Sequence, residues 1–143
     1  MPLEEPPRDA QGSVVPHNHH QISDEDGVLR RISPLHLVED EKADGGKRVS
    51  SMAFQPSSGQ NGGMSVDLER SIVEAGANPR THVISPPFIG AVRFVAGQLR
   101  AEQFQVGYDP LPENPHHGEV WGSFSASKKK RLQALAEMYV KPK

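Results

Sequence analysis

The sequence predicts an α+β domain with a small, largely antiparallel sheet of about five strands, two helices packed on that sheet, and a disordered tail before it. Three observations lead to this prediction. Several segments alternate apolar and polar residues, as half-buried strands do, whereas two segments show helical periodicity. Their order is strand, strand, helix, strand, strand, strand, helix, which favours antiparallel pairing. A polar, proline-containing stretch precedes all of them.

Length and composition indicate one domain and one unfolded segment. The chain of 143 residues suits a single core, and its 13 glycines and 13 prolines exceed the averages of roughly 7% and 5%. Residues 1–26 combine prolines, acids and the histidines of HNHH, and cannot bury enough apolar surface to offset the entropy of ordering. We therefore expect a disordered acidic tail over residues 1–26 and a single α+β domain over residues 27–141. In a flexible tail the histidines would bind a metal only adventitiously, since nothing orients them.

Charge and composition exclude several classes of function. The net charge of -2 gives no global attraction to nucleic acid or to an anionic membrane surface. The absence of cysteine excludes disulfides, thiolate metal sites and cysteine nucleophiles. No segment approaches the roughly 18 apolar residues of a membrane span, and the N-terminus lacks the pattern of a signal peptide. We therefore expect a cytoplasmic protein with no membrane partner and no cofactor.

The first strands are predicted on either side of a charged loop. Residues 27–33 alternate apolar and polar side chains until Pro34, whose ring removes a backbone donor and ends the strand. Residues 39–46 form the charged loop, and residues 47–56 are predicted to be a second strand. Residues 57–63, SSGQNGG, are predicted to be a flexible loop.

The middle of the chain is predicted to form a helix and then a hairpin. Ser65 can cap a helix over residues 66–75, and Gly76 would close it. Valine and phenylalanine dominate residues 88–100, and apolar residues alternate in residues 101–110, so both segments are predicted to be strands. Their link is short, which favours a hairpin.

The C-terminal part is predicted to form a turn, a strand and a helix. The prolines of residues 109–117 indicate a turn, and a short last strand follows around Val120. Residues 125–140 are expected to form a helix because their apolar residues fall on one stripe. That stripe contains Leu132, Leu135, Ala136 and Tyr139.

The segment NPHHGEVWG, residues 114–122, places two histidines ahead of a glutamate. Adjacent residues of an extended chain point to opposite sides, so His116 and His117 cannot both bind one ion, whereas His117 and Glu119 share a face. A metal would also need a third ligand and a surrounding shell of hydrogen bonds that the segment does not supply. We therefore interpret it as a turn leading into a strand, with no metal ion. A binding site at the histidine pair is the alternative.

A second set of polar residues follows successive predicted strands. The set comprises Arg30 or Arg31, then Ser50 or Ser51, then Glu119. In order and residue type it resembles the arginine, serine and glutamate arrangement of mono-ADP-ribosyltransferases. The resemblance implies that the arginine holds a phosphate, the serine positions a ribose, and the carboxylate stabilises the cationic sugar as nicotinamide leaves. This sequence departs from that pattern, because no threonine separates the serines and His117 stands where a second acid would precede Glu119.

The same residues have a purely structural interpretation. Serines on strands commonly face solvent or bond to neighbouring backbone groups, and an arginine stem can cover apolar surface. On the enzymatic interpretation the candidate catalytic residues are Arg31, Ser51, His117 and Glu119.

A basic cluster lies at the start of the predicted C-terminal helix. It consists of Lys128, Lys129, Lys130 and Arg131. Cations in a first helical turn face the positive end of the helix dipole, so bound phosphates of RNA or DNA, or the acidic tail, could offset that cost. Four basic residues more often form a solvated face, and no wider basic stripe accompanies them.

Three functional hypotheses remain at this stage. The first is a non-enzymatic binding module for a protein partner, built from the loops at residues 57–63 and 109–117 and the strand that carries Trp121, since loops held by a rigid sheet often bind partners. Trp121, the only tryptophan, would be an exposed anchor or would pack under the C-terminal helix. The second hypothesis is an enzyme with the arginine, serine and glutamate site. The third is nucleic-acid binding through residues 128–131.

Overall fold

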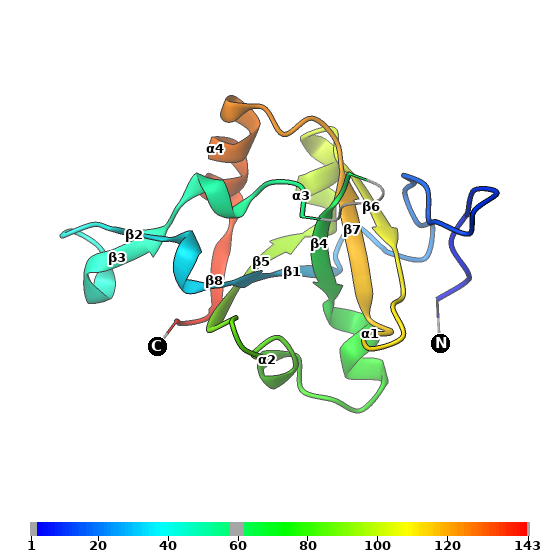
Figure 1. The fold of residues 1–143 in the computed structure, drawn as a ribbon, viewed down its shortest axis with the longest axis horizontal. Helices are drawn as coiled ribbons and strands as arrows, with labels where there is room; N and C mark the ends of the chain where they lie inside the picture. Colours follow the sequence, from blue (N-terminus) through cyan, green and yellow to red (C-terminus); the bar gives the residue numbers. More distant parts are fainter. Residues whose placement is uncertain (1–2, 58–61, 143) are drawn as a thin grey trace.

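A computed structural model describes residues 3–57 and 62–142 and confirms the α+β class (Figure 1). Six strands form one antiparallel sheet in the order β6-β7-β4-β1-β5-β8, and β2 and β3 form a separate two-stranded sheet. The strands are β1 Gly27–Ile32, β2 Leu37–Glu39, β3 Lys47–Val49, β4 Met64–Leu68, β5 Gly90–Val95, β6 Gln105–Tyr108, β7 His117–Trp121 and β8 Glu137–Val140. The helices are α1 Glu69–Glu74, α2 Pro79–His82, α3 Ala96–Ala101 and α4 Ala126–Leu135, with short 3₁₀ turns at Pro34–His36, Asp44–Gly46 and Ser51–Ala53.

The central strand β1 pairs unequally with its two neighbours. Its register with β5 extends over the whole strand, from Gly27 opposite Val95 to Ile32 opposite Gly90. Its register with β4 consists of Val28 opposite Leu68 and Leu29 opposite Asp67. Beyond these pairs the two strands diverge, and β4 continues beside β7 (Figure 1). The sheet therefore forks between β1 and β4.

Helices cover both faces of the sheet. On one face Val28, Ile32 and Val66 pack with Phe54, with Leu99 of α3 and Leu132 of α4 in one buried cluster. On the other face Leu29 and Ala91 pack with Ile72 of α1 and Val83, which follows α2. Alternation along each strand sends successive side chains to opposite faces, which is why β1 contributes to both clusters.

The segment after Ser65 differs from the prediction. Residues 64–68 form strand β4, and helix α1 begins only at Glu69. Met64, Val66 and Leu68 are buried, and they alternate with the polar Ser65 and Asp67. Pairing with both β1 and β7 satisfies the backbone of this segment, so long-range contacts override the local capping signal.

Two further predicted elements are shorter than expected. Residues 88–100 contain strand β5 up to Val95, and helix α3 begins at Ala96. The predicted strand at residues 47–56 ends at Val49, and Ser50 caps the following turn by accepting a hydrogen bond from Met52 N at 3.1 Å. The first predicted strand is thus cut short by a helix and the second by a 3₁₀ turn.

The C-terminal helix ends earlier than predicted. Helix α4 stops at Leu135, Ala136 adopts an extended conformation, and residues 137–140 form strand β8 on the free edge of β5. Tyr139 therefore lies on a strand and not on the helical stripe. Leu132 is fully buried, as predicted, and Leu135 packs against the same core cluster.

Residues 3–26, for which we expected disorder, contact the edge strand β6. His19 N donates to Val106 O at 3.0 Å, and Val106 N donates to Asn18 Oδ1 at 2.9 Å. His19 and Ile22 are buried. Polar side chains and backbone groups make these contacts, so the segment lacks the apolar periodicity by which an ordered element is recognised.

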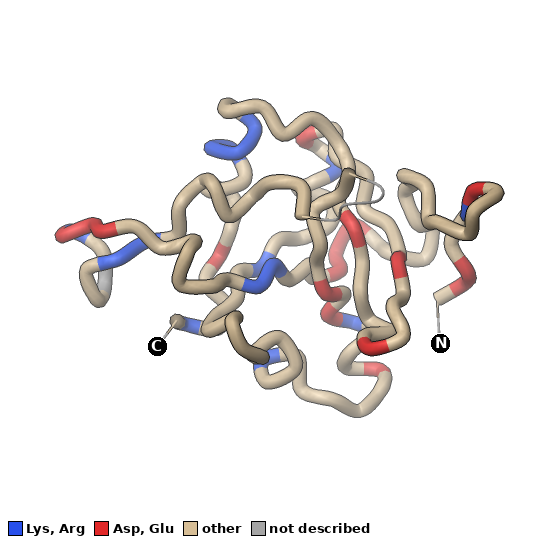
Figure 2. The backbone as a smooth tube through the Cα atoms, in the orientation of Figure 1, with Lys and Arg blue, Asp and Glu red and all other residues tan. Residues whose placement is uncertain are grey.

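None of the helices in the described ranges has the length and apolar character needed to cross a membrane. Charged side chains gather at the fork, where Figure 2 shows basic residues in the middle of β1 and acidic residues on β4 and β7 beside it. This concentration of charge inside a sheet is the main polar feature of the fold.

Candidate functional site

Three neighbouring strands bring an arginine, a serine and a glutamate together at the fork. Arg30 lies on β1, Ser65 on β4 and Glu119 on β7. Ser65 is directly opposite Glu119 in the register of β4 and β7. Arg30 Nη1 donates a hydrogen bond of 2.9 Å to the backbone oxygen of Ser65, beyond the last register pair of the two strands, Leu29 opposite Asp67. The three residue types of the predicted constellation thus meet in one place.

Arg30 is a buried cation held by backbone and side-chain oxygens. Its Nε donates to Ala53 O at 3.0 Å, and its Nη1 also donates to Ser57 Oγ at 3.2 Å. Within residues 3–57 and 62–142, its Nη2 group makes no hydrogen bond. Burial lowers the pKa of Arg30 to about 10, although the nearby Glu119 carboxylate acts in the opposite direction. Arg30 therefore stays positively charged at neutral pH.

Glu119 is the most deeply buried acid described, with an exposed fraction of 0%. Gly63, just before β4, packs against it: a Cβ on Gly63 would lie 2.6 Å from Glu119 Oε2 and 2.9 Å from Trp121 Nε1. Removing a carboxylate from water costs free energy, so burying Glu119 near Arg30 and His117 lowers the stability of the fold unless these neighbours offset the cost. A buried carboxylate beside a buried guanidinium is typical of a functional site as well as of an ion-pair network.

His117 stands between two acids. Its Nδ1 lies 2.8 Å from Asp109 O, and because a carbonyl oxygen only accepts, Nδ1 donates and Nε2 is left as the basic nitrogen. Nε2 lies 4.0 Å from Glu119 Oε1, and Nδ1 lies 3.5 Å from Asp109 Oδ2. Ligand atoms of Asp109, His117 and Glu119 fall within 4.8 Å of one another, so this trio is the part of the described chain that could hold a divalent metal.

Arg31, the other predicted arginine, is engaged in an ion pair. Its Nε donates to Asp67 Oδ2 at 2.8 Å and its Nη2 to Asp67 Oδ1 at 3.3 Å. Asn114 Nδ2 also donates to Asp67 Oδ1, at 2.7 Å, and His82 Nε2 lies 3.5 Å from the same oxygen. This buried carboxylate uses Arg31 to join β1, β4 and the turn before β7, so Arg30 is the arginine of the site.

The serines at the site differ from those predicted. Ser50 caps a 3₁₀ turn and Ser51 lies within it. Ser57 Oγ instead accepts from both Arg30 and Ser65 N, the latter at 2.9 Å. The alternation of residues 64–68 around a polar Ser65 was the sequence signal for a serine on a central strand.

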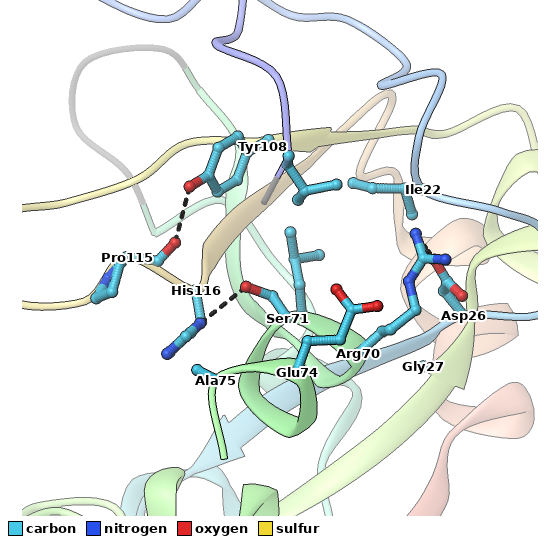
Figure 3. A pocket seen from close by; sticks show the side chains of 12 residues that line it. Ile22, Asp26, Gly27, Arg70, Ser71, Glu74, Ala75, Tyr108, Pro115 and His116 are labelled. Atoms are coloured by element: carbon cyan, nitrogen blue, oxygen red, sulfur yellow. Dashed lines mark hydrogen bonds and ion pairs between the residues drawn. The ribbon is translucent and has the colours of Figure 1, made fainter. Parts of the chain in front are cut away.

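A separate cavity of about 280 Å³ lies beyond the C-terminal end of β4 and contains His116 (Figure 3). Ser71 Oγ and His116 Nδ1 are 2.8 Å apart, and Tyr108 donates to Pro115 O at 3.0 Å. Figure 3 shows Glu74 between this pair and the cation of Arg70. Burial lowers the pKa of His116, and His82 acts in the same direction. His116 therefore lines this cavity, whereas His117 and Glu119 lie outside it.

The remaining predicted binding residues have structural roles. Trp121 is 4% exposed, so its ring is not an exposed anchor. Two residues of the predicted basic cluster contact Glu102: Lys128 Nζ donates to Glu102 O at 2.8 Å, and Arg131 Nε lies 2.9 Å from Glu102 Oε2. The other two residues of that cluster, Lys129 and Lys130, do not take part in these contacts. Of the predicted loop at residues 57–63, residues 58–61 lie outside the described residues.

No protein-family model, no curated protein and no solved structure matches this chain. Any functional assignment therefore depends on the geometry of the fork.

Proposed function

We propose that the fork between β1 and β4 is an NAD site of the ADP-ribosyltransferase type, with Arg30, Ser65 and Glu119 as its central residues. One observation carries the proposal. Arg30 donates to the backbone oxygen of Ser65, and the side chain of Ser65 is the register partner of that of Glu119, so the three residues are close together. The pairing of β1 with β4 ends at Leu29 and Asp67, so the strands themselves do not hydrogen-bond at the proposed site.

Each residue has a role that follows from its surroundings. The Nη2 group of Arg30 would donate to a phosphate oxygen, a charge-assisted bond that a guanidinium forms well. Ser65, which is half-buried beside Glu119, would position the ribose attached to nicotinamide. The Glu119 carboxylate would stabilise the positive charge that develops on this sugar, and low local polarity strengthens that attraction.

The reaction breaks the bond between ribose C1′ and the nicotinamide nitrogen, and the electron pair of that bond leaves with nicotinamide. A nucleophile, either water or a hydroxyl of an acceptor, then forms the new bond to C1′ and loses a proton. His117 Nε2, the basic nitrogen of that ring and 4.0 Å from Glu119 Oε1, would take the proton. His117, which stands where mono-ADP-ribosyltransferases carry a second acid, would thus act as the proton acceptor.

Two observations weigh against the other hypotheses. A binding module centred on Trp121 needs an exposed ring, and Trp121 is buried. Nucleic-acid binding through residues 128–131 needs free cations, and Glu102 already pairs with Lys128 and Arg131.

The direct test is to incubate the full chain with NAD and to measure released nicotinamide by chromatography and ADP-ribose attached to the chain by mass. Glu119→Gln keeps the shape of the side chain and removes its charge, and we expect its rate to fall by about 100-fold or more. Glu113→Gln changes an exposed acid on the turn before β7 and serves as the matched control, with an unchanged rate.

The controls separate catalysis from folding. The amide spectrum of Glu119→Gln should keep the dispersion of the wild-type spectrum, so that a lost rate reports chemistry. A wild-type chain that binds NAD without releasing nicotinamide would refute the enzymatic role and leave a nucleotide-binding module. A wild-type chain that neither binds nor cleaves NAD would refute the proposed function as a whole.

A further inference from the structure

The indole of Trp121 is a buried hydrogen-bond donor at the proposed site. Trp121 lies two residues after Glu119 on β7, so both side chains project from the same face of the sheet. Its side chain is 4% exposed, and Nε1 finds no acceptor anywhere in the described residues. Buried indole N–H groups usually have a partner, so an unpartnered one needs an explanation.

The indole is also fixed in orientation. A Cβ on Gly107 would lie 2.5 Å from Trp121 Cζ3, which shows how closely β6 packs against the ring. The ring of His17 lies 5.2 Å from the ring of Trp121, measured between centroids. The N–H group therefore cannot turn away to find a partner elsewhere, and its direction is set by the fold.

Trp121 Nε1 and Glu119 Oε2 lie close to the same point. The Cβ position of Gly63 lies 2.9 Å from Trp121 Nε1 and 2.6 Å from Glu119 Oε2. A donor and an acceptor that converge in this way complement a hydroxyl group, whose oxygen accepts one hydrogen bond while its proton makes another. A carboxylate ligand would be repelled by Glu119, and an ammonium ligand would leave the indole N–H without an acceptor.

We propose that Trp121 is a ligand-binding residue whose indole N–H donates to a ribose hydroxyl of the substrate, beside the carboxylate of Glu119. This inference rests on the proposed NAD site and adds a residue that determines which part of the ligand is held. Because even a Cβ on Gly63 would lie too close to both groups, the space beside them is filled, and the inference requires Gly63 to move when a ribose enters. The inference therefore predicts a change at Trp121 on binding.

The presence of a single tryptophan gives a direct measurement. The full chain, labelled with ¹⁵N, has one indole N–H resonance, which can be followed by NMR during titration with ADP-ribose. ADP, which lacks the second ribose, is the control ligand. We expect ADP-ribose to move the indole resonance downfield, as a new hydrogen bond does, and ADP to leave it in place.

A variant tests the hydrogen bond itself. Trp121→Phe keeps an aromatic ring and removes the donor, and we expect about tenfold weaker binding of ADP-ribose with unchanged binding of ADP. A purely structural role for the indole would weaken both ligands equally. Unchanged ADP-ribose affinity in Trp121→Phe, or an equal indole shift with ADP, would overturn the inference.

The same titration separates this inference from the proposed function. If amides around Ser65 and Glu119 move with ADP-ribose while the indole resonance stays fixed, Trp121 has no ligand role and the NAD site stands. If ADP-ribose and NAD both leave every resonance in place, the proposed site is refuted, and the role of Trp121 falls with it.

Discussion

Replacing Gly63 by alanine tests the packing at the proposed site. The added methyl group would lie 2.6 Å from Glu119 Oε2, 2.9 Å from Trp121 Nε1 and 3.1 Å from Glu119 Cβ. Neither neighbour can yield easily, since Glu119 is fully buried and Trp121 is held by Gly107 and His17. The backbone of Gly63 must therefore retreat, which strains the hydrogen bond from Ser57 N to Gly63 O.

The expected loss follows from two opposing effects. Overpacking a tight site typically costs about 1–3 kcal/mol. Replacing glycine by alanine also restricts the unfolded chain, which stabilises the fold by roughly 0.4–1 kcal/mol. From the middle of each range, Gly63→Ala is predicted to lower the free energy of unfolding by about 1 kcal/mol, measured by urea denaturation followed through the fluorescence of Trp121.

Gly62→Ala is the matched control. Gly62 has a φ of +74° and no atom of the described residues within 4 Å of its Cβ position, so alanine there meets backbone strain and not a described neighbour. Both variants should lose stability, but only Gly63→Ala should shift the emission and the indole resonance of Trp121. If Gly63→Ala matches the wild-type stability and leaves Trp121 unchanged, then Gly63 does not pack against these groups and the description of the site is wrong.

Three other outcomes follow from the structure. Leu132→Ala should cost about 2–5 kcal/mol in urea denaturation, whereas Leu35→Ala, at a side chain 92% exposed, should stay within about 0.5 kcal/mol. Burial lowers the pKa of three histidines from the ordinary value of 6.5, namely His17, His36 and His116. At pH values between the lowered pKa values and 6.5, the unfolded chain binds more protons than the folded chain. The urea midpoint should therefore fall as the pH drops through this range, and a rising midpoint would contradict the burial of these histidines. Deleting residues 1–24 should lower the melting temperature, because His19 and the bonds to Val106 are lost; an unchanged value would show that this segment does not pack on β6.

The sequence predicted those strands whose apolar residues alternate without interruption. Strand β1 and the strands around Val106 and Val120 were expected close to where they lie, because one face of each packs into the core. Strand β4 was mistaken for part of a helix, since a serine before an apolar run is also a capping signal. Its true conformation depends on pairing with β1 and β7, which lie far away in the sequence.

The proposed site shares residue types, but not every position, with the candidates taken from the sequence. Arg30 or Arg31 and Glu119 were candidates because their order and type resemble the mono-ADP-ribosyltransferase arrangement, and their catalytic role stays a prediction. The structure has Ser65, and not Ser51, on the strand between β1 and β7, and the order of the strands could not be read from the sequence. The unpartnered donor of Trp121 could not be predicted either, since hydrogen-bond satisfaction is a property of the packed structure.

The rate of nicotinamide release from NAD, compared between the wild-type chain and Glu119→Gln, tests the central claim most directly. The geometry of Arg30, Ser65 and Glu119 predicts measurable release by the wild-type chain and a rate lower by about 100-fold or more in the variant, with the fold preserved. Equal rates in the two proteins, or no release by the wild-type chain, would contradict the assignment of the fork as an ADP-ribosyltransferase-type site.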